Sequence, residues 1–188
     1  MAMAAMDAAS ILDRDDMSPT AQSKLRRDFL DAMSHVASTV YVVTTDGPAG
    51  RYGMTVSALS SVTAETERPT LLICVNRTCS SAYALLHNAV FCVNVLRDTQ
   101  RVLAERFAGQ HGADTMEKRF ASADWVATDT GAPRMIGALA AFDCRIASRK
   151  DIGTHHVLFG EVMNTHLDGG GLPLVYARRS YQTIQTNT

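Results

Sequence analysis

The sequence predicts a mainly β domain, an antiparallel barrel with a few short helices on its outside. Three observations support this prediction. The chain has 188 residues, of which 46% are hydrophobic and 20% charged, as is typical of one ordinary globular domain. Runs of β-branched and aromatic residues outnumber the stretches with helical spacing. Strands and helices do not alternate regularly, which disfavours a doubly wound parallel sheet.

The first regular element is expected after residue 23. Apolar residues recur at helical spacing over 24–37, for example Phe29, Met33 and Val36, and this predicts an amphipathic helix. Residues 1–23 are expected to be a flexible tail, and residues 24–188 a single domain. The tail has neither the basic start and apolar core of a secretory signal nor the acid-poor composition of a transit peptide. A cytoplasmic location is therefore expected.

Strands are predicted where β-branched and apolar residues alternate or cluster. They cover residues 40–45, 52–57, 59–64, 70–76 and 90–96. The stretch 70–76 is apolar almost throughout, so it is expected to be buried on both faces of a sheet. Short helices are predicted at 80–87 and 99–108, and Gly109 is expected to cap the second of them.

The second half of the chain contains the longest predicted strands. Residues 110–133 are polar and rich in turn residues, so little regular structure is expected there beyond a turn around 114–120. Two long strands are predicted, one starting at residue 140 and one from 155 to about 166, with a turn over 150–153 between them. A glycine turn at 169–171 precedes a short final strand that begins at 174.

Charge and cysteine usage narrow the class of function. Eighteen Lys and Arg residues against nineteen Asp and Glu give a formal net charge of −1, which argues against nucleic acid as the main partner. No apolar run approaches the roughly 20 residues of a membrane span. The four cysteines lack zinc-site spacing and are expected to be reduced and buried, and no metal is expected. Motifs of serine hydrolases, P-loop enzymes, zinc proteases and Rossmann dehydrogenases are absent from the sequence.

Two segments combine small or hydroxyl residues with strand and helix ends. Residues 53–61 would let a flat ligand approach a strand backbone, although a solvated surface strand is the simpler interpretation. Residues 74–81 lead from a strand into a helix start, where backbone amides and hydroxyls suit a phosphate. The simpler alternative is that Ser80 or Ser81 only caps the helix.

Two further segments are candidates for a binding site. Residues 106–110 end a helix in small residues, which can also be a plain glycine cap. Residues 153–156 open a strand with two adjacent histidines, His155 and His156. Neighbouring strand residues point to opposite faces, so the pair cannot chelate one metal ion together. One histidine is expected to face a cleft and the other to point outward.

Taken together, these segments resemble the short-chain flavin reductases of the flavin reductase-like family. The resemblance covers about residues 29–181 and includes the segments 91–96, 107–109, 160–162 and 174–179. Within that family, the sequence is most similar to the subgroup that supplies reduced flavin to two-component aromatic monooxygenases, such as those acting on 4-hydroxyphenylacetate, phenol and chlorophenol. The resemblance implies a split β-barrel with a Greek-key core. It also implies a homodimer with flavin sites near the subunit interface and a flavin-dependent oxygenase as partner.

The resemblance also implies which residues bind the cofactors. The residues expected to bind flavin are Met54, Thr55, Val56, Ser57, Ser60, Ser61, Asn76, Ser80, Ser81, Ala108 and Gly109. Those expected on the NADH side are His155, Tyr176 and Arg179, with His155 positioning the nicotinamide. Thr154 replaces the aspartate of the commoner Gly-Asp-His motif, so a role for a carboxylate at that position is not expected.

The function implied is hydride transfer from nicotinamide C4 to flavin N5. FAD is the expected flavin, with FMN as the other possibility, and NADH is the expected donor. The cofactors carry the chemical step, while the protein stacks two rings and stabilises charge, which suits a sequence with no catalytic triad or carboxylate pair. A flavin carrier or sensor remains an alternative, although residues 153–155 favour a nicotinamide face. A pyridoxamine-phosphate type oxidase also remains open, and it would need basic residues around a phosphate.

Overall fold

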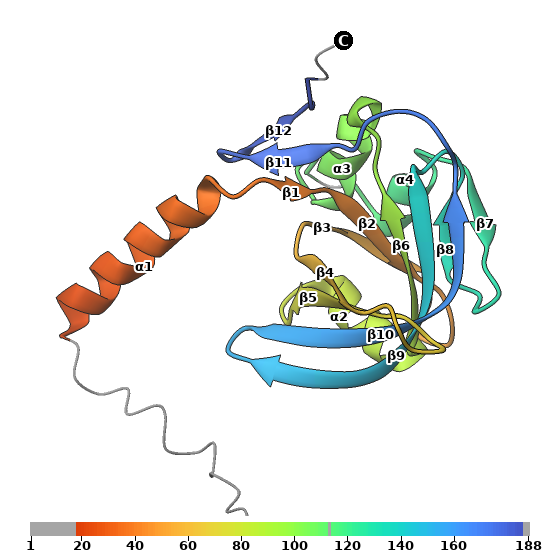
Figure 1. Ribbon diagram of the computed structural model, residues 1–188, viewed down its shortest axis with the longest axis horizontal. Coiled ribbons are helices and arrows are strands. Elements are labelled where there is room, and N and C mark those ends of the chain that lie inside the picture. Colours follow the sequence, from red (N-terminus) through yellow and green to blue (C-terminus); the bar gives the residue numbers. More distant parts are fainter. Residues whose placement is uncertain (1–17, 113, 186–188) are drawn as a thin grey trace, which may run out of the picture. The chain divides into compact units, whose positions relative to one another are not determined.

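The computed structural model describes residues 18–112 and 114–185 (Figure 1). The chain divides into two compact units, residues 1–36 and 37–188, each of which is described by itself. The first unit contains the helix α1 (Pro19–Ser34). Ser18 caps this helix, because its Oγ accepts a hydrogen bond from the Ala21 amide at 3.3 Å, and Pro19 fits the first helical position. The helix therefore begins before the predicted residue 24, and residues 1–17 of the predicted tail lie outside the described residues.

The second unit is built on a seven-stranded antiparallel sheet. Its strands are β2 (Tyr41–Thr45), β3 (Tyr52–Val56), β4 (Leu59–Thr63), β5 (Thr70–Asn76), β6 (Val90–Val95), β9 (Ala140–Ile152) and β10 (His155–Leu167). Their order across the sheet is β3-β2-β6-β9-β10-β5-β4, and every pairing is antiparallel (Figure 1). The prediction of a mainly β chain with a few short helices is confirmed.

The two edges of this sheet are joined by a very short connection. β3 and β4 occupy opposite edges, yet only Ser57 and Ala58 separate them in the sequence. The chain from Val56 to Leu59 spans at most about 11 Å, so the sheet must curl until its edges approach there. The Cys74 amide donates to the Ala58 carbonyl at 3.1 Å and fixes this connection to β5. Residues 57–58 are called the seam below.

Smaller elements surround the curled sheet. The strands β1 (Ser38–Thr39), β11 (Val175–Ala177) and β12 (Ser180–Gln182) form one small sheet, and β7 (Trp125–Ala127) pairs with β8 (Pro133–Met135). The helices are α2 (Ser80–Asn88), α3 (Arg101–Phe107), which follows the 3-10 turn η2 (Asp98–Gln100), and α4 (Met116–Phe120). Gly109 follows α3 with φ +76° and its amide donates to the Arg106 carbonyl, which confirms the predicted glycine cap. Within the described part of the chain, no helix is long and apolar enough to cross a membrane.

Three expectations about local structure are wrong. In β5, burial alternates along the strand, with Leu71, Ile73 and Val75 buried and the residues between them half-exposed, so only one face lies against the core. The segment 110–133 contains α4, β7 and the first residue of β8 rather than turns alone. The strand β9 continues through residues 150–152, and the turn that follows is the two-residue pair Gly153–Thr154.

One large core cluster includes residues of β2, β5, β6 and β10. Val43, Ile73, Phe91 and Leu158 are almost completely buried in one cluster. Gly160 on β10 belongs to this packing, because a Cβ atom built on it would lie 2.4 Å from Phe91 Cζ. Only glycine therefore lets the Phe91 ring lie flat against β10.

A buried amide joins three strands beside a second cluster of apolar residues, which includes Val42 and Met135. Asn94 on β6 has no exposed surface, and its Nδ2 donates to the Val42 carbonyl at 3.0 Å and to Thr44 Oγ1 at 3.3 Å. Its Oδ1 accepts a hydrogen bond from the Met135 amide at 2.7 Å. One side chain thus ties β2, β6 and β8 together, and both ends of its amide are satisfied.

Candidate functional site

A cavity of about 320 Å³ lies beside the seam, between β3, the end of β5, the start of β10 and the end of α3. Its lining is formed by Met54, Thr55, Val56, Ser57, Ala58, Cys74, Val75, Asn76, Cys79, Phe107, Ala108 and His155. These residues come from four segments that are distant in the sequence. They meet because the short seam brings the edge strand β3 close to β5 and β10.

One wall of this cavity is suited to a flat heteroaromatic ligand. β3 is an edge strand, and among the described residues no strand pairs with its outer side. Ser81 occupies the Gly53 carbonyl, and the outward backbone amides and carbonyls of β3 that line the cavity are available to ring nitrogens and oxygens. Ser57, Ala58 and Ala108 present small side chains beside this edge, so a ring can approach the backbone closely.

Phe107 at the end of α3 also lines the cavity, and it is held by aromatic packing. Phe107 is 2% exposed and meets Phe120 and Trp125 edge-to-face, with ring centroids 5.3 Å and 5.7 Å apart. Behind it, a Cβ atom on Gly53 would lie 2.6 Å from the Phe107 ring, so glycine is needed at that position of β3. Thr55 Oγ1 donates to the Ala104 carbonyl at 2.6 Å and fixes α3 against β3.

A second cavity of about 180 Å³ continues this site. It shares Thr55, Ser57 and Ala108 with the first cavity and is completed by Val40, Gln110, Tyr176 and Tyr181. The two tyrosine rings meet edge-to-face at a centroid distance of 5.2 Å. Partial burial and the neighbouring Glu105 carboxylate raise the pKa of Tyr181, so its phenol stays protonated at neutral pH and is able to donate a hydrogen bond.

The turn between β11 and β12 is unusual. Arg178 and Arg179 both have positive φ values, +51° and +59°, in a two-residue hairpin turn. Glycine and asparagine are the residues that normally occupy such positions, and each non-glycine residue there carries backbone strain. The strained turn lies directly after Tyr176 and Ala177, at the end of the strand that contributes to the second cavity.

The rim of the first cavity carries His155, the first residue of β10. It pairs with Asn76 at the end of β5, and Thr154 Oγ1 lies 3.0 Å from His155 Nδ1. The neighbouring His156 is only 8% exposed, and its Nδ1 lies 2.6 Å from Asp151 Oδ1. That hydrogen bond, together with Arg149 and Arg77, lowers the pKa of Asp151. His155 thus lines the cavity and contacts Thr154, whereas His156 contacts Asp151. The expectation that the second histidine points outward is wrong, because His156 is buried.

The structure brings together many of the residues that the sequence singled out. Met54, Thr55, Val56, Ser57, Asn76, Ala108 and His155 line the first cavity, and Tyr176 lines the second. The remaining predicted residues line neither cavity; they are Ser60, Ser61, Ser80, Ser81, Gly109 and Arg179. Ser81 is buried and its Oγ donates to the Gly53 carbonyl at 2.9 Å, so its hydroxyl supports β3.

Several lining residues were not among the predicted site residues. Cys79 follows β5, and its Sγ lies 3.7 Å from Met54 Sδ, within the cavity wall. Phe107, Gln110 and Tyr181 reach the site through α3 and β12. Phe107 and Gln110 belong to the segment 106–110 that the sequence had marked, whereas Tyr181 has no local signal and is placed by the pairing of β11 with β12.

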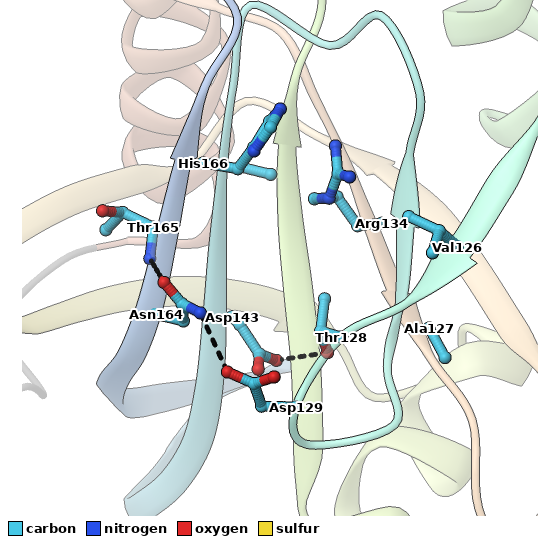
Figure 2. Close-up of a pocket in the computed structure, with 10 residues that line it drawn as sticks. Val126, Ala127, Thr128, Asp129, Arg134, Asp143, Asn164, Thr165 and His166 are labelled. Carbon is cyan, nitrogen blue, oxygen red and sulfur yellow. Dashed lines mark hydrogen bonds between the residues drawn. The ribbon is translucent and has the colours of Figure 1, made fainter.

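A separate cavity of about 230 Å³ lies at the far end of β9 and β10 (Figure 2). It is roughly 35 Å from His155 along β10, so it does not belong to the site described above. Asp143 in its wall is 3% exposed and accepts hydrogen bonds from the hydroxyls of Thr128 and Thr130 at 2.8 Å and 2.5 Å. This carboxylate holds the turn between β7 and β8 against the sheet.

The four cysteines fall into two groups. Cys74 and Cys79 line the first cavity and are half-exposed, whereas Cys92 and Cys144 are completely buried. Burial raises the pKa of both buried thiols, and the carboxylate of Asp143 adds to this effect. Among the residues that the structure describes, no group of three or more His, Cys, Asp or Glu side chains is arranged to hold a metal ion.

The chain is similar to known proteins over most of its length. Residues 33–185 match the flavin reductase like domain family. The chain is 43% identical over 159 residues to the FMN reductase (NADH) RutF of Ancylobacter novellus, and the match covers 85% of each protein.

Two solved structures share the fold. BorF, the flavin reductase component of a bacterial two-component tryptophan halogenase, is similar with a TM-score of 0.76 and 27% identity, over 86% of this chain and 99% of BorF. The NADH:FAD oxidoreductase SgcE6 of Streptomyces globisporus C-1027 is similar with a TM-score of 0.75 and 26% identity, over 92% of each chain. The chain therefore belongs to the flavin reductase-like domain family, and with it to the flavin reductase enzymes.

Proposed function

We propose that this protein is an NADH:flavin oxidoreductase whose flavin and nicotinamide rings meet in the cavity beside the seam. The observation that carries the proposal is the joining of a free strand edge, small side chains and His155 around one cavity. The 43% identity to an FMN reductase (NADH) over most of the chain supports it. The hydride would pass from nicotinamide C4 to flavin N5, a step whose chemistry the cofactors supply.

The protein's own groups would position and stabilise rather than react. The outer edge of β3 would donate and accept hydrogen bonds along the flavin ring, with Ser57 and Ala58 leaving room for it. Backbone donors fixed in place are suited to the negative charge that develops on a reduced flavin ring. His155 and Tyr176 would lie on the nicotinamide side, in the first and second cavity respectively. The two cavities share Thr55, Ser57 and Ala108, so they adjoin, which suits two ligands in contact.

The ribityl and phosphate end of the flavin would extend toward Asn76 and the start of α2. Ser80 and the amide of Ser81 open α2, just after that end of β5. Ser60 and Ser61 on β4 would contact the ribityl chain further along β5, where they pair with Leu72 and Leu71. Gly109 would line the far end of the flavin beside Ala108, and Arg179 would meet NADH from the strained β11–β12 turn. These assignments rest on the family resemblance.

FMN is the flavin that we propose to test first. The relative with 43% identity is named as an FMN reductase, whereas the NADH:FAD oxidoreductase is 26% identical. FAD, which the sequence resemblance favoured, stays a prediction for the same site. NADH is the proposed donor in both cases.

We also propose how the protein acts in a larger system. Reduced flavin would be passed to a separate flavin-dependent oxygenase, as the description of BorF as one component of a two-component system supports. An aromatic compound as the substrate of that oxygenase remains the proposal of the sequence resemblance. The curled sheet would close as a split β-barrel, and two copies would form a homodimer with the flavin sites near their interface. A cytoplasmic location completes this proposal.

NADH oxidation by the purified protein, followed at the nicotinamide absorbance band, tests the function. Turnover should require added FMN or FAD, and the same plate compares NADPH with NADH. His155→Ala should raise the KM for NADH, while His166→Ala, at the other end of the same strand, should leave it unchanged. Binding of flavin without consumption of NADH would contradict the reductase and favour a flavin carrier.

A further inference from the structure

Two adjacent histidines on β10 have different partners for the same ring nitrogen. His156 Nδ1 lies 2.6 Å from a carboxylate oxygen of Asp151, on the buried side of the strand. His155 Nδ1 lies 3.0 Å from the hydroxyl of Thr154, on the cavity side. A carboxylate can only accept a hydrogen bond, whereas a hydroxyl can either accept or donate one. The histidine at the candidate site is therefore the one whose partner leaves the choice of tautomer open.

The backbone around this pair is fixed from two directions. Gly153, with φ +55°, and Thr154 form a two-residue turn between β9 and β10, so Ile152 and His155 pair directly. The Arg77 amide donates to the Thr154 carbonyl at 3.0 Å, which ties the turn to the end of β5. The freedom left to His155 lies in its imidazole ring, and Thr154 Oγ1 lies within hydrogen-bond distance of that ring at 3.0 Å.

We propose that Thr154 is a positioning residue whose hydroxyl donates to His155 Nδ1, so that the imidazole presents an Nε2–H donor to the cavity. This inference rests on the proposed function, because the acceptor for that donor would be the nicotinamide carboxamide of NADH. An aspartate at position 154 would instead accept from Nδ1 and leave Nε2 without a proton. Thr154 thus reverses the hydrogen-bonding direction of the neighbouring histidine toward its ligand.

Steady-state kinetics on a double-mutant cycle tests the inference. Thr154→Val removes the hydroxyl at nearly constant shape and should raise the KM for NADH roughly fivefold, the value of one neutral hydrogen bond, with flavin affinity unchanged. Thr154→Ser should restore the KM to near the wild-type value. In a His155→Ala background, Thr154→Val should have no further effect, because Thr154 acts only through the imidazole. Additive effects of the two substitutions would overturn the proposal.

A spectroscopic measurement separates this inference from the function itself. Nitrogen-15 correlation spectra of the imidazoles, with His155 assigned by His155→Ala, should show His155 protonated at Nε2 in the wild-type protein. In Thr154→Val the same ring should lose this single tautomer. A proton on Nδ1 in the wild-type protein would overturn the inference even if NADH oxidation is normal. Absence of flavin-dependent NADH oxidation in the wild-type protein would instead contradict the proposed function.

Discussion

The buried amide of Asn94 allows a sharp test of how the sheet is held together. In Asn94→Asp the size of the side chain is unchanged, and the oxygen that accepts from the Met135 amide at 2.7 Å is kept. The nitrogen that donates to the Val42 carbonyl at 3.0 Å is replaced by an oxygen. An ionised carboxyl would therefore face a carbonyl in a site with no exposed surface, and the introduced group should hold a proton instead.

The expected cost follows from the pH. The unfolded-state pKa of an aspartate carboxyl is about 3.9. If the folded protein keeps this carboxyl protonated, the free energy of unfolding falls by about 1.4 kcal/mol for each pH unit above that value. Between pH 4.5 and pH 7.5 the penalty should therefore grow by about 4 kcal/mol, on top of about 1 kcal/mol for the lost donor. Because the folded-state pKa is raised, this stability is present at low pH and lost as the pH rises toward the folded-state pKa. Such a loss is a large share of the 5–15 kcal/mol stability of an ordinary domain.

Urea unfolding of the wild-type and variant proteins at pH 4.5 and pH 7.5 measures this difference. The single tryptophan, Trp125, reports unfolding by fluorescence and lies on β7, the strand paired with β8. Asn94→Leu is the matched control, because its loss of hydrogen bonds should not depend on pH. An equal loss of stability for Asn94→Asp at the two pH values would refute the argument that this amide is sealed from water.

Two further predictions concern packing and thiol chemistry. Gly160→Ala should lower the free energy of unfolding in urea by about 1–3 kcal/mol, because the added Cβ would lie 2.4 Å from Phe91 Cζ. Gly169→Ala is the control and should have little effect, because a Cβ at that position meets no atom within 4 Å. A thiol reagent should modify Cys74 and Cys79 in the native protein and all four cysteines in urea. The reason is that burial shields Cys92 and Cys144 and raises the pKa of their thiols. Rapid reaction of all four thiols in the native protein would contradict this.

The strands were the most predictable part of the fold. The predicted stretch 70–76 coincides with β5, because β-branched and apolar residues bounded by polar ones leave little alternative. Its expected burial on both faces was wrong, since an apolar run does not reveal that Leu72 and Cys74 lie on the side away from the core. A split barrel over residues 24–188 stays a prediction, because β3 and β4 share no ladder among the described residues.

The elements that sequence reasoning missed are short and depend on distant partners. The hairpin of β7 and β8 is fixed by the indole of Trp125, which donates to the Phe120 carbonyl, and by the Met135 amide, which donates to Asn94. None of these contacts follows from local propensity. The start of α1 was predictable in principle, because Ser18 followed by Pro19 is a common helix start.

Site residues that lie within one short segment were predictable from the sequence, whereas those brought to the site by strand pairing were not. Met54, Ser57 and Ala108 lie in the marked segments and do line the cavity, although whether they bind flavin stays a prediction. Tyr181 entered the site only through the pairing of β12 with β11, which the sequence did not indicate. Ser81 is a residue type that often binds phosphate, yet its hydroxyl donates a hydrogen bond to the Gly53 carbonyl on β3.

The seam has a consequence for how binding and rigidity are linked. The cavity is lined by β3, the first strand in the order of the sheet, and by β10 and β5, the fifth and sixth. A ligand held there contacts the edge strand β3 as well as β5 and β10, and no hydrogen-bond ladder joins β3 to either of those two strands within the described residues. A ligand at a hundred times its dissociation constant adds about 2.7 kcal/mol to stability, and here that gain comes from contacts shared between β3 and the strands β5 and β10. On the proposed function, each release of reduced flavin would remove the ligand contacts between β3 and the strands β5 and β10, and each newly bound flavin would restore them.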